Sequence, residues 1–190
     1  MKSKLLKEKF KYDGTQLRSL YAYMNYGLLG NSIIAWEGAC NVSFEHMVDG
    51  EDLLAEAKIA GSHMLHFIVE VFNYDLMGAV PLQRLLASTV KEVLEQTSPV
   101  LQDKKSTLIR KGDDIFLKDH KLSISIATSS PVSRLIHFAV NVSNKGTPVK
   151  TLSLDDLKIK PTSLAKEVLS RFSEEVESMI EATQKVRPVQ

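Results

Sequence analysis

The sequence predicts an α+β domain with a mixed or antiparallel sheet flanked by helices. Three observations support this fold class. Segments rich in β-branched and aromatic residues recur along the chain, and two long segments carry apolar residues at helical spacing. The two kinds of segment are also grouped rather than strictly alternating. Strict alternation would have favoured a doubly wound parallel sheet.

The strand patterns fall in both halves of the chain. Each is an apolar or alternating run bounded by turn residues such as Asp13-Gly14 or Asn144-Lys145-Gly146. The run after residue 64 is rich in β-forming residues and is expected to be a central strand. The expected strands cover residues 6–11, 32–38, 41–47, 64–72, 107–110, 115–117, 122–128 and 135–142.

The helix patterns are marked by caps and by apolar stripes. Asp49 is a plausible N-cap for a short helix to residue 58, and Pro81 suits the first turn of a helix that runs to residue 96. Residues 15–26 and 163–183 carry apolar residues three and four apart, which is typical of amphipathic helices. Residues 153–156 resemble a capping box that opens a short helix.

Length and charge limit the kinds of function to consider. The 190 residues fit one domain spanning 1–190, and the formal net charge of +1 gives no reason to expect nucleic acid or an anionic membrane as partner. Apolar stretches are far shorter than the roughly 20 residues of a membrane helix. The basic N-terminus is not followed by an apolar run, and Cys40 is the single cysteine, so we expect a cytoplasmic protein without disulfides.

The segment Arg110-Lys111-Gly112-Asp113-Asp114-Ile115-Phe116-Leu117-Lys118-Asp119-His120-Lys121-Leu122 resembles the catalytic hairpin of biotin protein ligases. Those enzymes have a basic residue, a turn ending in Asn-Asp, a strand, a polar hairpin and then a lysine. The resemblance implies a biotin/lipoate-ligase-like fold, related to that of class II aminoacyl-tRNA synthetases, over roughly residues 107–185. It also implies that Lys121 is the catalytic cation, bridging a substrate carboxylate and a phosphate. Asp114 would orient the neighbouring backbone, and Asn141 would support the site.

The first half of the chain carries a weaker resemblance. Residues 60–66, Ala-Gly-Ser-His-Met-Leu-His, are similar to the glycine-rich stretch of lipoate ligases, with Gly61 and His66 at matching places. The arginine- and glycine-rich phosphate loop of biotin ligases has no counterpart here. ATP is the cofactor that the resemblance allows, but no motif identifies a cofactor, which stays unknown.

The whole chain is also identified as a member of an uncharacterised prokaryotic family known only as a domain of unknown function. The stretches that carry this resemblance are Leu17-Arg18-Ser19, Tyr26-Gly27-Leu28-Leu29-Gly30-Asn31-Ser32 and Ser125-Ile126-Ala127-Thr128-Ser129-Ser130-Pro131-Val132-Ser133. It bears on identity and not on mechanism.

Other residues offer competing sites. Arg18 could be a second anion clamp, because guanidinium pairs bidentately with carboxylate or phosphate. The hydroxyls of residues 129–133 could bind an anion, although a surface connection is the commoner role of such a loop. Cys40 is more often a core residue than a nucleophile. His63 and His66 are three apart and point to opposite faces of a strand, so they do not readily share one metal ion.

The leading hypothesis is a divergent ligase-like domain that binds a small carboxylate or nucleotide, with acyl-adenylate or acyl-transfer chemistry as the reaction the fold suggests. Lys121 is its central cation, and the secondary candidates are Arg18, Gly61, His66, Asp114 and Asn141. The rival hypothesis is a non-catalytic ligand-binding or assembly protein on the same fold, which predicts a homodimer through an apolar sheet edge or helix face.

Overall fold

The computed structural model describes residues 1–104 and 106–189 and is built around a five-stranded sheet. The strand order is β1-β2-β3-β8-β7. β1 pairs with β2 in parallel, and the remaining neighbours are antiparallel, so the predicted mixed sheet is confirmed. The strands are β1 (Lys2–Leu5), β2 (Ser32–Asn41), β3 (Ala60–Val71), β7 (Ser123–Ser129) and β8 (Arg134–Asn141).

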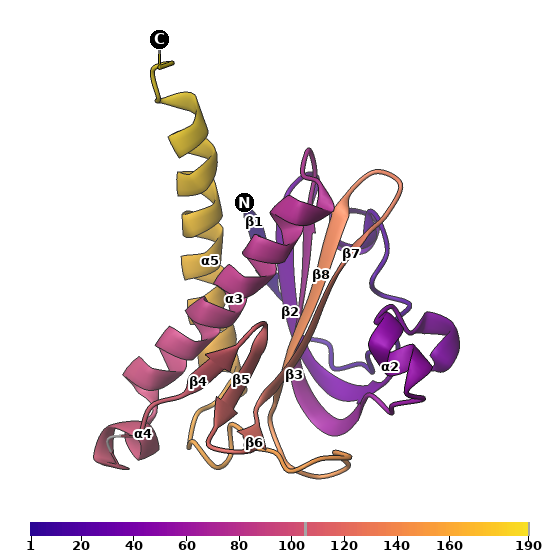
Figure 1. Ribbon diagram of the computed structural model, residues 1–190, viewed down its shortest axis with the longest axis vertical. Helices are drawn as coiled ribbons and strands as arrows, with labels where there is room; N and C mark the ends of the chain where they lie inside the picture. The colour runs from indigo at the N-terminus through magenta and orange to yellow at the C-terminus, as the bar shows by residue number, and fades with distance from the viewer. Residues whose placement is uncertain (105, 190) are drawn as a thin grey trace.

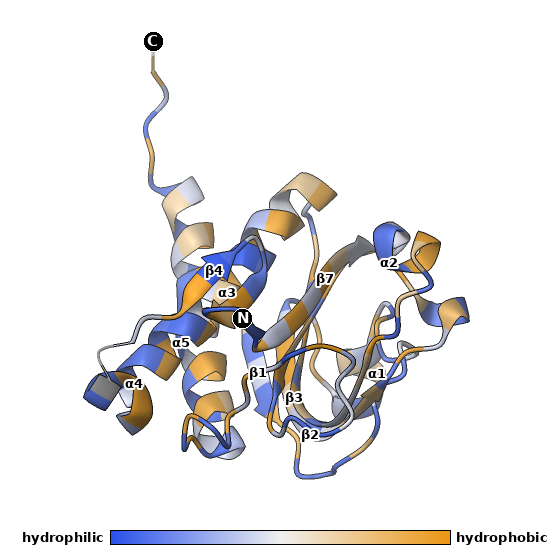
Figure 2. Cartoon of the chain, turned by 60° about the horizontal axis from the view of Figure 1, so that its bottom comes forward, coloured by the Kyte–Doolittle hydropathy of each residue, from blue (hydrophilic) through white to orange (hydrophobic). Residues whose placement is uncertain are grey.

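Two long helices, α3 (Leu76–Thr97) and α5 (Pro161–Gln184), cover one face of this sheet (Figure 1). Their apolar stripes meet side chains of β3 and β8, and Phe67, Phe138 and Phe172 are fully buried between the layers. Figure 2 shows hydrophobic and hydrophilic residues alternating along both helices, as an amphipathic stripe requires. This layer is the main hydrophobic core. The short helix α4 (Pro99–Lys104) follows α3 in the chain.

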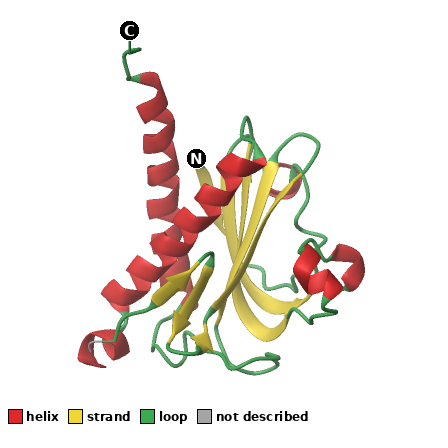
Figure 3. Ribbon diagram, in the orientation of Figure 1, coloured by secondary structure: helices red, strands yellow, loops and turns green. Residues whose placement is uncertain are grey.

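The opposite face of the sheet carries a second, smaller core built on aromatic rings. Trp36 of β2 stacks on Phe10 with ring centroids 4.7 Å apart, and its indole N–H donates to the Phe10 carbonyl over 3.0 Å. The short elements α1 (Tyr21–Tyr26), η1 (Phe44–His46) and α2 (Gly50–Leu54) lie on this side, away from α3 and α5 (Figure 3). This face therefore has room for a site that the long helices do not fill.

A small three-stranded sheet holds the hairpin that the sequence singled out. β4 (Ile109–Lys111), β5 (Asp114–Leu117) and β6 (His120–Lys121) pair antiparallel in that order. Lys118 turns the chain between β5 and β6 with φ 57°, a left-handed conformation. The predicted strand pair is confirmed, and β7 follows directly after Leu122.

Several predicted elements have different bounds in the structure. Residues 41–47 are not a strand, because β2 ends at Asn41 and the chain then makes the turn of η1. The expected helix over 15–26 forms only from Tyr21, since the Asp13 carboxylate accepts hydrogen bonds from Thr15 and stabilises a turn instead. The first strand lies at Lys2–Leu5, where it pairs with β2, and not at residues 6–11.

The helix expected to begin at Pro81 begins at Leu76, because Asp75 caps it by accepting from the Gly78 N–H over 2.6 Å. Pro81 therefore lies inside the helix. Ser153 and Asp156 form the reciprocal hydrogen bonds of a capping box, but the chain there makes turns and no helix. Among the described residues, no helix is both long enough and apolar enough to cross a membrane.

Gly38 is a position where only glycine fits. A Cβ atom there would overlap the carbonyl oxygen of Phe10, which belongs to backbone that the Trp36 indole also fixes. We expect Gly38→Ala to lower the free energy of unfolding by about 2 kcal/mol or more, as overpacking does in rigid surroundings. Urea unfolding at neutral pH measures this loss.

Gly50→Ala is the matched control, since a Cβ at Gly50 meets no atom within 4 Å. It should change the free energy of unfolding by less than about 0.5 kcal/mol. Equal effects of the two substitutions would contradict the packing of Phe10 against β2.

Candidate functional site

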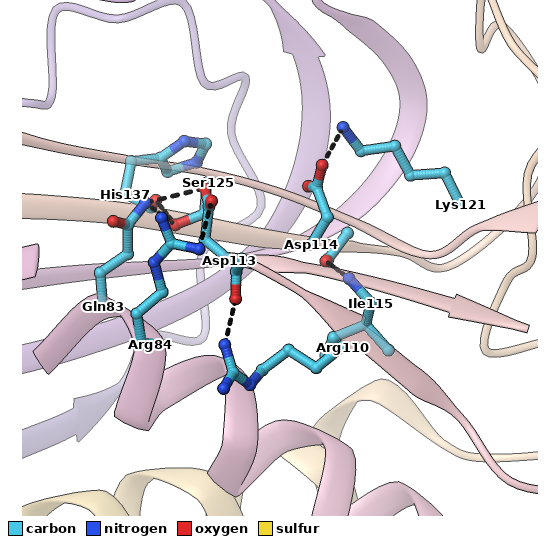
Figure 4. Close-up of polar contacts among 11 residues, drawn as sticks. Gln83, Arg84, Arg110, Asp113, Asp114, Ile115, Lys121, Ser125 and His137 are labelled. Atoms are coloured by element: carbon cyan, nitrogen blue, oxygen red, sulfur yellow. Dashed lines mark hydrogen bonds and ion pairs between the residues drawn. The ribbon is translucent and has the colours of Figure 1, made fainter. Parts of the chain in front are cut away.

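Lys121 lies at the end of β6 and forms an ion pair across the small sheet. Its Nζ is 2.7 Å from Oδ2 of Asp114 on β5, and the two side chains point toward each other in Figure 4. Both are partly shielded, with side-chain exposures of 31% and 26%. Burial raises the pKa of the Asp114 carboxyl, and the bond from Lys121 opposes that rise. The pair is thus a partly desolvated charge pair rather than a solvated surface contact.

The backbone of Lys121 is held from two sides. Its N–H donates to the Lys150 carbonyl over 3.1 Å, and its carbonyl accepts from the N–H of Leu152 over 3.0 Å. The Asn141 amide on β8 also donates to that carbonyl and to the Leu152 carbonyl, at 3.2 Å each. Asn141 therefore joins the large sheet to the segment that positions Lys121.

A cavity of about 330 Å³ opens beside Lys121 on the aromatic face of the sheet. One wall comes from the segment between β2 and β3, and the other from β5, β7 and β8. We call it the acidic cavity, because five carboxylates line it and Lys121 is the only Lys or Arg among its lining residues that the structure describes. The carboxylates belong to Asp49, Glu51, Asp52, Asp113 and Asp114.

A second cavity, of about 200 Å³, lies on the other side of Lys121. Lys121 and Lys58 are its cations, Asp52 is its one carboxylate, and Asn141 also lines it. We call it the apolar cavity, because most of its remaining wall is hydrophobic: Ala57, Ile59, Ala60, Met64, Ile124, Pro148 and Val149. Lys121 thus stands where two cavities of opposite character meet.

A hydrogen-bond network links the hairpin to α3 and β8 behind the acidic cavity (Figure 4). Gln83 of α3 donates from Nε2 to Asp113 and to the Ser125 hydroxyl, each over 2.9 Å. Ser125 in turn donates to the His137 carbonyl over 3.0 Å, and Arg84 lies 3.4 Å from Asp113. The turn that precedes β5 is therefore fixed to the main sheet.

Three aromatic residues form a buried stack at the floor of the acidic cavity. Tyr12 stacks on the His137 ring with centroids 3.7 Å apart, and His137 Nε2 is 3.1 Å from Nδ1 of His66. His66 Nε2 is 3.3 Å from the Gly38 carbonyl. Burial lowers the pKa of His66 to about 4 and holds the pKa of His137 well below its ordinary value. Both histidines are therefore neutral at pH 7.

These contacts determine where the two protons lie. A carbonyl only accepts, so neutral His66 carries its proton on Nε2 and donates it to Gly38. Its Nδ1 then accepts, so His137 donates from Nε2. Neutral His137 therefore carries its single ring proton on Nε2, and its Nδ1 is a hydrogen-bond acceptor.

The structure brings some predicted site residues together and leaves others apart. Lys121, Asp114 and Asn141 form the centre described above. His66 lies behind His137 and lines neither cavity. Arg18 is exposed, packs over the Tyr21 ring at 5.6 Å and lines neither cavity. Gly61 is buried beside Met64, where a Cβ would crowd the Met64 sulfur.

The competing sites are explained by packing and local bonds. The hydroxyls of Ser130 and Ser133 bond to each other, and Ser133 donates to buried Glu70 over 2.6 Å. His63 contacts Glu37 at 2.9 Å. Among the described residues, no group of three or more His, Cys, Asp or Glu could hold a metal ion. These hydroxyls and this imidazole therefore already have protein partners.

Tyr12, His137 and the acidic wall are not among the site residues that the sequence predicts. Tyr12 reaches the site because its backbone pairs with Cys40 at the edge of β2, which no local pattern indicates. The acidic residues of 49–52 were assigned to a helix start, and Asp49 does cap α2. Their second role, facing Lys121 across a cavity, depends on the tertiary fold.

Comparison with known proteins agrees with this architecture. A family model described as domain of unknown function DUF366 matches residues 1–187. A protein of unknown function from Pyrococcus horikoshi is 39% identical, with a TM-score of 0.88 over 99% of this chain and 100% of that one.

Two ligand-bound structures share the fold at low identity. Biotin protein ligase from Aquifex aeolicus, in complex with biotin and ATP, has a TM-score of 0.60 and 12% identity over 93% of this chain and 73% of that one. Protein Ta0514 from T. acidophilum, with bound lipoic acid, has a TM-score of 0.56 and 12% identity over 93% and 87%. The predicted ligase-like fold is confirmed by these similarities, which show the fold alone.

The buried histidines predict a pH dependence of stability. In the unfolded chain they bind protons below about pH 6.5, whereas folded His66 does so only near pH 4, so stability is lost as pH falls through this window. We expect the free energy of unfolding to drop by roughly 2 kcal/mol between pH 7.5 and 5 from His66, with His137 adding to the loss. Urea unfolding at three pH values tests this.

His120→Gln is the control, because this histidine is about half exposed, with a side-chain exposure of 48%. Its pH profile should match that of the unaltered chain. A free energy of unfolding that stays constant from pH 7.5 to 5 would contradict the neutral histidine pair.

Cys40 is buried, and burial raises the pKa of its thiol to about 12. A thiol with that pKa holds very little thiolate at pH 7.5. We expect its reaction with a disulfide reagent to be roughly a thousandfold slower in the folded chain than in guanidinium. Folded and unfolded rates within tenfold of each other would restore Cys40 as a candidate nucleophile.

Proposed function

Because this chain belongs to the DUF366 family and has the fold of biotin and lipoate ligases, we propose that it binds a small carboxylate with an apolar chain. The ligand carboxylate pairs with the Lys121 ammonium, and the chain enters the apolar cavity. The observation that carries the proposal is the position of Lys121, whose side chain lines both cavities and whose backbone is held by Asn141 and residues 150–152.

The electrostatics of the Lys121–Asp114 pair fit this role. An ammonium group has three donors, and Asp114 is its single ion-pair partner among the described residues, so donors remain for a second carboxylate. Partial burial strengthens a charge-assisted bond over the same bond in water. Lys58, which lines the apolar cavity, supplies a second positive charge for the ligand.

The volume and walls of the apolar cavity favour a chain over a bulky polar group. A cavity of about 200 Å³ with aliphatic walls accommodates a short hydrocarbon, whose burial contributes about 0.8 kcal/mol per methylene. Protein Ta0514, which shares this fold, holds lipoic acid, a carboxylate on a hydrocarbon chain. A biotin protein ligase of the same fold holds biotin, which is also a carboxylate.

A nucleotide fits the acidic cavity less well than a carboxylate does. The five carboxylates of the acidic cavity would repel a triphosphate. Acyl-adenylate chemistry would need ATP to bind there. The same repulsion opposes that binding, so the proposal includes the carboxylate and not ATP. We expect ATP without a divalent cation to leave the melting temperature unchanged.

The test is a thermal-shift series with octanoate, lipoate, biotin and ATP, each with the unaltered chain and with Lys121→Ala. At a ligand concentration of 100 times Kd, binding adds about 2.7 kcal/mol to the free energy of unfolding. We expect octanoate or lipoate to stabilise the unaltered chain, Lys121→Ala to abolish the effect, and Lys121→Arg to restore part of it.

Lys166→Ala is the matched control, because Lys166 is an exposed lysine of α5 that lines neither cavity. It should respond to ligand like the unaltered chain. No stabilisation by any of the carboxylates, or equal stabilisation of the Lys121→Ala variant, would overturn the proposal.

A further inference from the structure

Two largely buried polar side chains on the wall of the acidic cavity each have a hydrogen-bonding atom without a protein partner in the described part of the chain. Tyr12 and His137 both line the cavity and are each 3% exposed. Within the described part of the chain, neither the Tyr12 hydroxyl nor His137 Nδ1 forms a hydrogen bond, although Nε2 of His137 does. Neither atom is among the fully enclosed side-chain atoms without a partner in the described part of the chain, so both are open to the cavity. These two groups are therefore available to a ligand or solvent there.

The direction of His137 Nδ1 follows from its neighbours. The two nitrogens of an imidazole point to nearly opposite sides of the ring, and Nε2 points toward His66 on β3. Nδ1 therefore points to the β7 side of β8, where Ile124 and Ile126 line the cavity. The stacked Tyr12 ring holds the imidazole in this orientation. His66 is the positioning residue, because its bond to Gly38 fixes which nitrogen of His137 accepts.

The charge of the cavity wall determines what kind of donor would be favoured. Asp114 is neutralised by Lys121, and Asp113 lies 3.4 Å from Arg84. Asp49, Glu51 and Asp52 have no ion-pair partner among the described residues. Three carboxylates without an ion-pair partner in the described part of the chain line one small cavity and create a negative potential that attracts cations.

The same carboxylates do not form a metal site. Within the described residues no three of the Asp, Glu, His or Cys side chains could hold one ion. Carboxylates that are spread over a wall suit a larger cation, and a ligand that also bonds to His137 Nδ1 must carry an N–H or O–H donor. An alkylammonium ion meets both requirements, because it has three donors and stays protonated at neutral pH, like the lysine side chain.

We propose that the acidic cavity binds the primary ammonium group of a small organic cation, with His137 Nδ1 as a hydrogen-bond acceptor and the carboxylates of residues 49–52 as counter-charges. The aliphatic part of the cation packs against Tyr12, Ile124 and Ile126. This subsite lies beside the one assigned to a carboxylate at Lys121 but does not depend on it. A ligand with both groups would occupy the two together.

Three four-carbon probes separate the effect of charge from that of the hydrocarbon chain: n-butylamine, n-butanol and butyrate. Titration of the isotope-labelled chain at pH 7.5, followed by NMR, measures millimolar affinities. We expect butylammonium to bind about tenfold tighter than butanol, since an ion adds a charge-assisted hydrogen bond. It should also shift the Nδ1 resonance of His137, and its affinity should fall as salt is raised.

His137→Phe should remove the advantage of butylammonium over butanol while leaving butyrate binding unchanged. Because this histidine is buried and the variant could fail to fold, Glu51→Gln with Asp52→Asn is the second test, since neither of these side chains is buried. This double variant should weaken butylammonium binding several-fold and leave butanol unaffected. Glu45→Gln, an exposed residue of η1 that does not line the cavity, is the matched control.

Two further ligands, 4-aminobutyrate and spermidine, distinguish the classes of amine that could bind. Tighter binding of 4-aminobutyrate than of butylammonium and butyrate would indicate a zwitterionic ligand, and tighter binding of spermidine would indicate a polyamine. Equal affinity for butylammonium and butanol, or a butylammonium affinity unchanged in the double variant, would overturn the proposal. The carboxylate proposal is judged by butyrate with Lys121→Ala, so the failure of one leaves the other open to its own test.

Discussion

The antiparallel pairing of β3 with β8 is the interaction on which the rest of the structure depends. Its register sets His66 opposite Ala139 and His137 opposite Ile68, so the two imidazoles become diagonal neighbours on one face. The same register brings Asn141 to the end of β8 beneath the Lys121 carbonyl. A slip of one residue would turn all three side chains toward α3 and α5, where the core has no place for them.

The two faces of this sheet differ in how they are covered. One face is sealed by α3 and α5, and its buried Phe and Leu side chains form the larger core. The other face is covered by short elements and turns, and both cavities open there. Aromatic stacking of Phe10, Trp36, Tyr12 and the histidines supports this second face without filling it. Rigid aromatic support with open space above it suits a binding site.

Lys121 lines both cavities and pairs with Asp114. Asp114 keeps the ammonium in place, and burial raises the pKa of the Asp114 carboxyl while the hydrogen bond from Lys121 opposes that rise. The wall that includes Asp49, Glu51 and Asp52 faces Lys121 across the acidic cavity and makes the potential there negative. The acidic cavity therefore combines one cation with several carboxylates, a charge distribution that the fold alone does not specify.

The sequence by itself determined the fold class, the hairpin of Lys121 and Asp114, the cap at Asp49 and the extent of the last helix to within a few residues. These features depend on local spacing, which periodicity and capping chemistry reveal. Tertiary structure alone decided that Tyr12 stacks on His137, that His66 fixes the tautomer and that Arg18 stands apart from the cavities. Those outcomes depend on strand register and on contacts between residues that are distant in the sequence, and no local pattern specifies them.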